Sequence, residues 1–351
     1  MYGQVVIGPP GAGKSTYCHG MYQFLSAIGR KSSIINLDPA NDRLPYPCDL
    51  DIRDYIELED VMNELNLGPN GGLMFAMESL ITNGIDLFLA KVKKLIDERS
   101  YLLFDCPGQI ELFTHHNALH KIFNTLTKQT KIRLCVVSLV DSIYLTSPSQ
   151  YISILLLSLR SMLQLELPQV NVISKIDLLK GYGSLPFKLD YYTEVQDLHY
   201  LTPYLEKESN SILGKKYVRL TELIGELVEE YHLVAFEVLF VENKQSMINL
   251  LSVIDKANGY SFGSEIGGDT IWSEAVRQGG TAEIQEVDIH ERWIDEKERY
   301  DKEEQEQQRA ANEEEAMNVD EKEVENVEDA EWEAALRDWE EKRGGSGAMN
   351  R

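Results

Sequence analysis

The chain has 351 residues, of which 43% are apolar, so it is long enough to bury a sizeable core in one large domain or two ordinary ones. Its net charge of −24 argues against a general binder of nucleic acid or anionic membranes. Residues 261–351 hold 28 acidic and 11 basic side chains, and so most of this charge. We predict a domain over residues 1–260 and an acidic tail, largely disordered because it has little apolar surface to bury.

The cysteines and the first predicted strand indicate a reducing compartment. No two cysteines have the spacing of a zinc site, and four are few for a disulfide framework, so we expect buried thiols in a reducing environment. The first predicted strand starts at residue 2, which leaves no room for a signal peptide. The most apolar helical stretch, residues 151–165, is too short and too interrupted to span a bilayer. We therefore expect a cytoplasmic protein that binds neither membranes nor nucleic acid directly.

A glycine-rich loop lies between a predicted strand over residues 2–7 and a predicted helix over residues 16–28. From Gly8 to Ser15 it matches the Walker A pattern, in which two glycines separated by four residues precede Lys-Ser. The backbone N–H groups of such a loop surround a phosphate, Lys14 reaches the β- and γ-phosphates, and Ser15 binds Mg²⁺. The predicted nucleotide-binding residues are Gly11, Ala12, Gly13, Lys14, Ser15 and Thr16.

A second strand is predicted over residues 31–37 and leads into Asp38. Pro39 disfavours a helical conformation at Asp38, so this acid lies on a loop at the carboxyl end of the strand, where ligands bind in open α/β sheets. Asp38 is a candidate to bind the metal and to position water. An ordinary Asp-Pro turn is the alternative interpretation, and this stretch alone leaves both open.

The next part of the chain is predicted to be helical. Helices are expected over residues 57–67, from 73 to about 80, and over 86–98. The first two are separated by Gly-Pro-Asn-Gly-Gly from Gly68 to Gly72, a sequence typical of a turn. Residues 42–56 are rich in turn formers, and we assign no strand to them.

The third predicted strand, residues 101–105, ends in Asp105 and is followed by Cys-Pro-Gly-Gln. An acid at a strand end before Pro-Gly-Gln matches the Walker B and switch pattern of nucleotide hydrolases. Asp105 would hold Mg²⁺, the Gly108 amide could meet the γ-phosphate, and Gln109 could orient the attacking water.

A predicted strand over residues 169–173 ends at Ser-Lys-Ile-Asp. This stretch resembles the guanine-recognition motif Asn/Thr-Lys-x-Asp, except that Ser174 occupies the first position. Guanine offers two adjacent donors that the carboxylate of Asp177 can accept together. Adenine lacks this pair and would leave the carboxylate unsatisfied, which is costly. The aliphatic part of Lys175 would lie across the base.

The remaining predicted elements complete a doubly wound α/β domain with a mainly parallel sheet of six strands and helical insertions. Residues 181–215 are expected to form a helical insertion, and residues 242–245 fall where a second base-contacting loop would lie. The other predicted elements are strands over 132–139 and 234–241 and helices over 148–165, 217–231 and 246–257.

One part of the acidic tail has helical spacing. Trp332, Leu336 and Trp339 recur at intervals of four and three residues among acids. They could form a partner-binding stripe, although a solvated, partly helical tail is the simpler interpretation.

Taken together, these motifs resemble those of the GPN-loop GTPases over residues 1–260, without the tail. Residues 8–18 and 189–198 look most similar to the second eukaryotic paralogue of that family. The stretches that carry the resemblance are 8–15, 38–41, 68–70, 105–109 and 174–177.

The resemblance implies a Mg²⁺-dependent GTP hydrolase that forms a homodimer, or a heterodimer with another GPN-loop GTPase. Gly68, Pro69 and Asn70 form the GPN loop, which then reaches the partner's nucleotide site. With Lys14, Asp38 and Gln109, Asn70 would serve catalysis, and Ser15, Asp38 and Asp105 would bind the metal. The resemblance further implies assembly of RNA polymerase II and III with their subunits or assembly factors, and shuttling between cytoplasm and nucleus.

The sequence departs from related dimerising NTPases in two respects. Pro9 and Pro10 stand where those proteins often carry an extra lysine, and no arginine finger is evident.

Three other functions compete with this interpretation. A small-molecule P-loop kinase usually has an arginine-rich lid, but residues 181–215 contain no arginine. A metal-insertion GTPase would need a His-rich or Cys-paired site, and His115-His116 alone is better explained as helix surface. The sequence does not exclude a scaffold that binds GTP without hydrolysing it.

Overall fold

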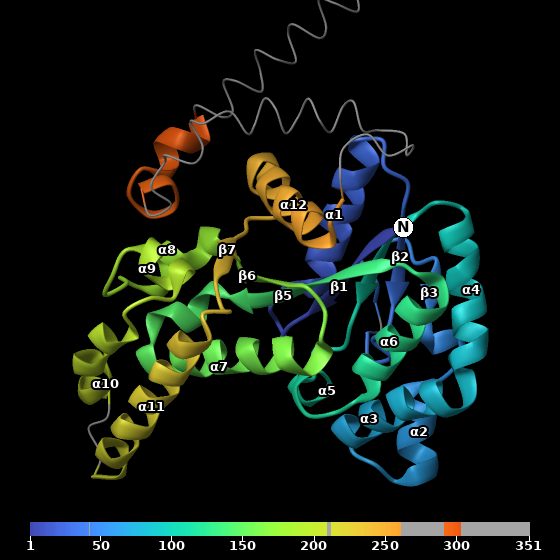
Figure 1. Ribbon diagram of the computed structural model, residues 1–351, viewed down its shortest axis with the longest axis horizontal. Coiled ribbons are helices and arrows are strands. Elements are labelled where there is room, and N and C mark those ends of the chain that lie inside the picture. The colour runs from blue at the N-terminus through green and yellow to red at the C-terminus, as the bar shows by residue number, and fades with distance from the viewer. Residues whose placement is uncertain (42, 209–211, 261–290, 303–351) are drawn as a thin grey trace, which may run out of the picture. The chain divides into compact units, whose positions relative to one another are not determined.

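A parallel sheet of seven strands forms the centre of the protein in a computed structural model that describes residues 1–41, 43–208, 212–260 and 291–302 (Figure 1). The strand order is β3-β2-β4-β1-β5-β6-β7, and every neighbouring pair is parallel. The predicted doubly wound α/β fold is confirmed. The strands are β1 (Tyr2–Ile7), β2 (Ser32–Asn36), β3 (Leu50–Asp51), β4 (Tyr101–Asp105), β5 (Arg133–Asp141), β6 (Gln169–Ser174) and β7 (Phe236–Val238).

The strand order determines where a ligand can bind. The chain runs from β1 to β2 and β3 on one side, returns to β4, and then crosses to β5 on the other side of β1. In open parallel sheets, the crevice at such a crossing, outside the carboxyl ends of the strands, is the usual ligand site. The loops after β1, β2, β4 and β6 carry the predicted motifs and all leave this edge.

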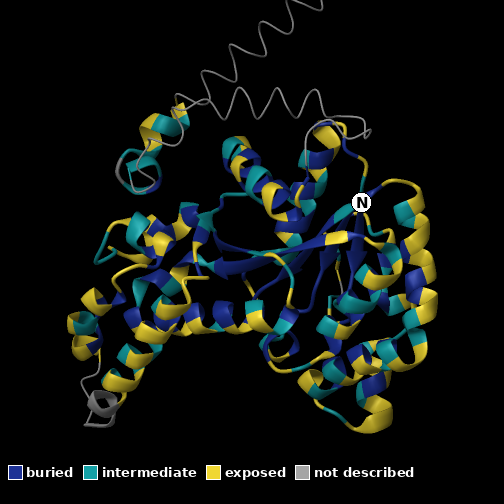
Figure 2. Cartoon of the chain, in the orientation of Figure 1, coloured by how far each residue is buried: buried dark blue, intermediate teal, exposed yellow. Residues whose placement is uncertain are grey.

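Helices cover both faces of the sheet, which explains why the strands are buried along nearly their whole length (Figure 2). On one face, α1 (Lys14–Ala27) and α12 (Lys244–Asn258) share a core with the sheet that includes Met21 and Leu251. On the other, the core includes Phe88 and Ile122, from α4 (Ile85–Asp97) and α6 (Ala118–Thr130). Full burial of one such side chain stabilises the fold by about 1.5–3 kcal/mol.

The GPN stretch begins a helix, so the predicted five-residue turn is wrong. After α2 (Leu58–Leu65), α3 (Pro69–Ser79) has Gly68 as its N-cap and Pro69 at its first position, where the missing N–H is harmless. Gly72 lies inside α3 because the helices approach closely: a Cβ there would lie 3.0 Å from Met62 Cγ. Glycine here permits packing rather than breaking the helix.

The predicted gap between the next two helices is also absent. A π-helical turn, η2 (Leu80–Gly84), joins α3 to α4 in one helical run, Pro69–Asp97, of 29 residues. Its length and apolar character alone would suffice to cross a membrane. Met77, Leu80 and Phe88, however, are buried in the core of this domain.

Other elements agree with the predictions or shift slightly. β4 and α7 (Pro148–Leu165) have the predicted bounds, whereas β3 is a strand that the sequence analysis missed. α11 (Ile212–Tyr231) starts earlier than predicted, and β7 is shorter. The short helices are α5 (Ile110–Thr114), α8 (Leu179–Tyr182), α9 (Leu189–Glu194) and α10 (Thr202–Glu208), the last two lying in the predicted helical insertion.

A buried ion pair ties the end of α1 to α12. Arg30 Nη2 lies 2.9 Å from Asp255 Oδ2, and the two side chains are 4% and 3% exposed. The Arg30 guanidinium also lies 4.4 Å from the centre of the Tyr260 ring. Burial makes such a pair sensitive to loss of either partner.

The chain divides into two units, Met1–His290 and Glu291–Arg351. In the second unit, Glu291–Asp295 forms a π-helical turn and residues 297–302 are helical. The predicted stripe at Trp332, Leu336 and Trp339 lies outside the described residues, as does most of the tail that we predict to be disordered.

Candidate active site

The P-loop joins β1 to α1 and leaves the start of that helix open to an anion. Gly13 is the N-cap, in the left-handed conformation (φ 91°), and no side chain caps the first N–H groups of α1. The first turn also lacks an acidic residue. Unsatisfied amides and the helix dipole therefore favour a phosphate at this end.

Lys14 and the loop after β4 lie against this P-loop. Lys14 Nζ donates a hydrogen bond to the Pro9 carbonyl oxygen at 3.4 Å. A Cβ on Gly108 would lie 2.9 Å from Lys14 Nζ and 3.2 Å from Pro10 Cα. A larger residue at this position would displace Lys14 Nζ and crowd Pro10, so glycine favours the close approach that brings Gly108 beside Lys14.

Two hydroxyl groups meet the buried carboxylate of Asp105. Ser15 Oγ and the Tyr46 hydroxyl each donate to Asp105 Oδ2 at 2.7 Å. Asp105 Oδ1 is buried and has no hydrogen-bond partner among the described residues. Burial raises the pKa of Asp105, and the hydrogen bonds from Ser15 and Tyr46 oppose that rise. A carboxylate with an unpartnered oxygen beside a hydroxyl suits a hard cation such as Mg²⁺.

The loop after β2 lies next to the same hydroxyl. Asn41 Nδ2 donates to Ser15 Oγ at 3.4 Å. Asp38 Oδ1 accepts a hydrogen bond from the Ala40 amide at 3.0 Å, and burial raises the pKa of Asp38. Asp38 makes no direct hydrogen bond to Ser15, so of the three predicted metal ligands, Ser15 and Asp105 touch and Asp38 lies in the adjoining loop.

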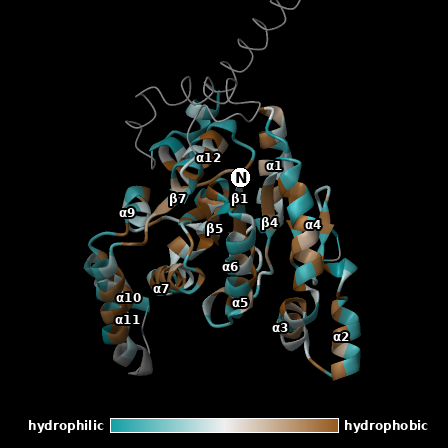
Figure 3. Ribbon diagram, turned by 45° about the vertical axis from the view of Figure 1, so that its right-hand side comes forward, coloured by the Kyte–Doolittle hydropathy of each residue, from teal (hydrophilic) through white to brown (hydrophobic). Residues whose placement is uncertain are grey.

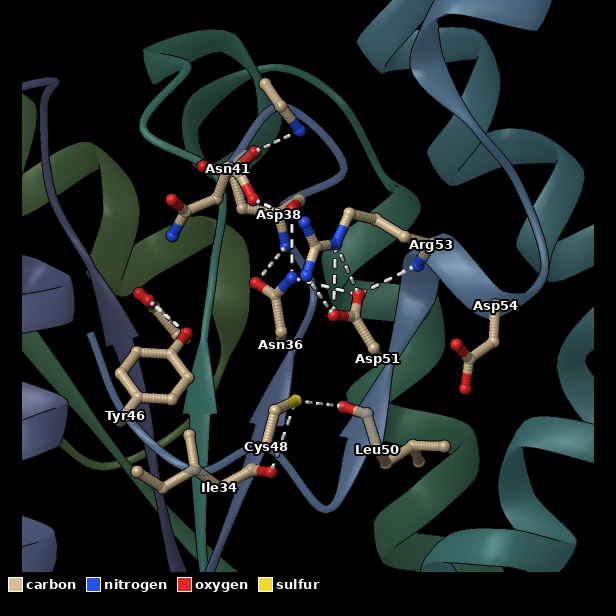
Figure 4. A network of polar contacts seen from close by, with 12 residues as sticks. Ile34, Asn36, Asp38, Asn41, Tyr46, Cys48, Leu50, Asp51, Arg53 and Asp54 are labelled. Carbon is tan, nitrogen blue, oxygen red and sulfur yellow. Dashed lines mark hydrogen bonds and ion pairs between the residues drawn. The ribbon is translucent and has the colours of Figure 1, made fainter. Parts of the chain in front are cut away.

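A network around Arg53 holds that loop in position (Figure 4). Arg53 Nη2 pairs with Asp51 Oδ2 at 2.7 Å, and Arg53 Nη1 donates to the Asn41 carbonyl oxygen at 2.9 Å. Asn36 Nδ2 donates to Asp51 Oδ1 at 3.0 Å and to the Asp38 carbonyl oxygen at 3.1 Å. β2, β3 and the Asp38 loop are thereby tied together.

The sequence analysis missed Tyr46, Asp51 and Arg53, and it gave no role to Asn41, although Asn41 lies in the stretch 38–41. All lie in or beside the stretch 42–56, to which we assigned no element. The only local signal was Asp51 two residues before Arg53, because Tyr46, between two prolines, meets Asp105 only when the chain has folded.

The loop after β6 is attached to the P-loop. Ser174 Oγ lies 2.7 Å from the Ala12 carbonyl oxygen. Lys175 Cε lies 3.9 Å from where a Cβ on Gly13 would be, and Lys175 Nζ pairs with Asp141 Oδ2 at 2.7 Å. The short helix Ile176–Leu178 follows and carries the half-buried Asp177. The predicted base-recognition motif therefore borders the predicted phosphate site.

Comparison with known proteins shows the family. A family described as "conserved hypothetical ATP binding protein" matches residues 6–260. GPN-loop GTPase 2 of Saccharomyces cerevisiae is 62% identical over 345 residues, 98% of each chain. The chain belongs to the GPN-loop GTPase family. GPN-loop GTPase 2 of Schizosaccharomyces pombe is 55% identical to it over 85% of this chain and 93% of its own length. The predicted similarity to the second paralogue is confirmed.

A solved structure resembles this GPN-loop GTPase in fold. It is a GTPase from Pyrococcus abyssi in its apo form, with a TM-score of 0.58 and 24% identity. The match covers 74% of this chain and 98% of the archaeal one. At this identity, the likeness bears on the fold alone.

The GPN loop that gives the family its name lies apart from the groups described above. Gly68, Pro69 and Asn70 are exposed. The Asn70 side chain makes no hydrogen bond to any residue that the structure describes. Gln109 is the N-cap of α5, and its buried Oε1 likewise has no partner within the described part of the chain. The catalytic roles of Asn70 and Gln109 stay predictions.

We predict that Asp105 binds Mg²⁺, and replacing Tyr46 by phenylalanine in this GPN-loop GTPase should then weaken that binding. The ring still fills its buried position, but Asp105 loses one of its two hydroxyl donors. We expect the Mg²⁺ concentration for half-maximal GTP hydrolysis to rise about threefold to tenfold, the worth of one hydrogen bond. Tyr101→Phe, which removes a buried hydroxyl bound to Gln4, is the control. An unchanged Mg²⁺ requirement would show that Tyr46 only fills space.

Proposed function

We propose that this GPN-loop GTPase is a dimeric switch that binds and hydrolyses GTP with Mg²⁺. The observation that carries the proposal is the contact of Ser15 with Asp105 at 2.7 Å, beside an unpartnered oxygen of the same carboxylate. The P-loop supplies a hydroxyl, and β4 supplies a carboxylate. This is the pairing that holds Mg²⁺ in P-loop hydrolases.

Each residue of the site has a proposed role. Ser15, Asp105 and Asp38 would hold Mg²⁺, which neutralises phosphate charge when bound. Lys14 offsets negative charge that develops on the phosphates, and the neighbouring Gly108 amide is available to a phosphate oxygen. Gln109 directly follows this glycine and is proposed to orient the attacking water.

Base selection is proposed for Lys175 and Asp177, because Ser174 attaches their loop to the carbonyl of Ala12. The family described above is named for ATP and the relatives for GTP, so the choice of base is worth testing. Asp177→Asn should abolish most of the preference for GTP over ATP while the fold survives, since one acceptor becomes a donor. Competition binding of GTP and ATP measures this preference. Unchanged selectivity would contradict the role of this loop.

We further propose that the protein works as a homodimer, or as a heterodimer with another GPN-loop GTPase. It would assist assembly and nuclear import of RNA polymerase II and III, contacting their subunits or assembly factors while shuttling between cytoplasm and nucleus. The resemblance of the motifs supports these proposals. Among the described residues there is no group of three His, Cys, Asp or Glu side chains able to hold a metal ion.

Single-turnover hydrolysis tests the proposed activity. The full chain, alone and mixed with candidate partner GTPases, is followed with GTP in Mg²⁺ and after chelation by EDTA. We expect phosphate release only with Mg²⁺, and its loss in Lys14→Ala and Asp105→Asn. GTP binding without phosphate release under every condition would instead favour the non-hydrolysing scaffold.

A further inference from the structure

Lys175 of the predicted base-recognition loop is held by the neighbouring strand. β5 (Arg133–Asp141) is a buried, largely hydrophobic strand (Figure 3) that ends in Asp141. Asp141 lies opposite Ser174 in the parallel ladder, so the end of β5 is close to the start of the base-recognition loop. Lys175 Nζ lies 2.7 Å from Asp141 Oδ2, and the two side chains are 34% and 14% exposed. The ammonium group of Lys175 therefore has a partner within the protein.

The carboxylate of Asp141 is itself fixed in place. Its Oδ1 accepts a hydrogen bond from the Ile143 amide at 3.0 Å and so caps the short helix Ser142–Thr146. One oxygen orients the side chain, and the other oxygen holds the lysine. This arrangement restrains Lys175 more firmly than an ion pair between two mobile surface side chains, which contributes little.

The rest of Lys175 is held as well. Its carbonyl oxygen accepts a hydrogen bond from the Ser142 hydroxyl at 2.9 Å. Its backbone lies in the left-handed region (φ 57°), which is uncommon for lysine. Its Cε lies 3.9 Å from the position of a Cβ on Gly13 of the P-loop. The aliphatic stem thus passes beside the P-loop, and residues at the end of β5 hold both its backbone and its charged end.

We propose that Asp141 is a positioning residue for the nucleotide base, because it holds the stem of Lys175 as a preformed surface for a purine ring. Asp141 would then determine how tightly the base is bound but not which purine is chosen. The inference rests on the proposed base recognition by Lys175 and Asp177. A mobile lysine stem would have to be immobilised when a base packs on it, which lowers affinity. The ion pair with Asp141 removes this cost, and the choice of base stays with Asp177.

Asp141→Asn tests the inference, because an asparagine oxygen can still accept from the Ile143 amide, whereas its NH₂ group cannot pair with an ammonium group. Binding of GDP, inosine diphosphate and inorganic pyrophosphate to the full chain is measured by calorimetry. Inosine diphosphate lacks only the N2 amino group of GDP, and pyrophosphate has no base. We expect both nucleotides to bind about threefold to tenfold more weakly, the cost of immobilising one long side chain, and pyrophosphate binding to stay unchanged.

Further variants show whether Asp141 acts through Lys175. Lys175→Met keeps an aliphatic stem without the ammonium group and should weaken both nucleotides to a similar extent. Adding Asp141→Asn to Lys175→Met should then have little further effect, because the two changes remove the same interaction. Glu98→Gln, which breaks the exposed pair with Lys31, is the matched control and should change none of the three affinities. Melting temperatures verify that each variant is folded.

Three outcomes for Asp141→Asn would overturn the proposal. The first is unchanged binding of GDP. The second is an equal loss of pyrophosphate binding, which would mean that the pair shapes the P-loop and not the base site. The third is a loss for GDP without a loss for inosine diphosphate, which would give Asp141 a part in choosing the base. Asp177→Asn should weaken GDP more than inosine diphosphate, and equal effects of that variant would instead contradict the proposed base recognition.

Discussion

Replacing Asn70 by alanine is expected to slow GTP hydrolysis in the proposed dimer by roughly 10- to 1000-fold, the range for losing one positioned polar group. The GTP affinity of the isolated chain should stay nearly unchanged. Asn70 is exposed in the first turn of α3 and has no hydrogen-bond partner among the described residues of its own chain. Its amide offers both a donor and an acceptor to a phosphate oxygen or the attacking water of a partner.

The rigid start of α3 favours this role. Pro69 restricts the backbone at the first position of α3, so less conformational entropy is lost when the loop enters a partner's site. The chain also has no lysine at Pro9 or Pro10 to complete its own P-loop.

A mixing experiment distinguishes action across the dimer from an effect within one chain. A Lys14→Ala subunit that keeps Asn70 is combined with an Asn70→Ala subunit that keeps its P-loop. If the loop acts in trans, the mixture should hydrolyse GTP, although each variant alone is slow. Asn63→Ala, an exposed asparagine on α2, is the matched control. Failure of rescue in a dimer shown to form would mean that the loop serves only to start α3.

Replacing Asp255 by alanine is expected to lower the free energy of unfolding by about 3–5 kcal/mol, the cost of leaving one member of a buried pair uncompensated. Arg30 would then be buried without its carboxylate, at 4% exposure. α12 would lose its tie to the end of α1. Urea unfolding measures the change, and Lys31→Ala is the control because its pair with Glu98 is exposed.

The combined replacement Arg30→Met with Asp255→Leu separates burial of charge from loss of packing. It should be far less destabilising than Asp255→Ala, since both charges leave together. A double variant as unstable as the single one would show that shape, including the contact of Arg30 with Tyr260, matters more than charge.

The sequence predicted well those elements that local chemistry specifies. β4 is a continuous apolar run that ends in an acid, and α7 starts at Pro148 after Ser147, whose hydroxyl accepts from the Gln150 amide. The loops with the P-loop, switch and base motifs leave the carboxyl edge of the sheet, as their positions after apolar strands required.

Elements that depend on distant contacts were not predictable in this way. β3 has two residues and exists only through pairing with β2. Gly72 was interpreted as a breaker because its packing against Met62 cannot be seen in the sequence. Tyr46 acquires its role by meeting Asp105, which is 59 residues away.

The π-helical turn Leu80–Gly84 closes i→i+5 hydrogen bonds and so holds one residue more than an α-helical turn. Deleting one residue there would leave an ordinary α turn, so Met77 would keep its place in the core and the GPN tripeptide its direction. Deleting one residue within α3 would instead turn everything before it by about 100° about the helix axis and draw it about 1.5 Å closer to α4. Evolution can therefore change the length of this helical run by one codon at the π-helical turn, but not in α3, where a deletion would misalign core and loop together.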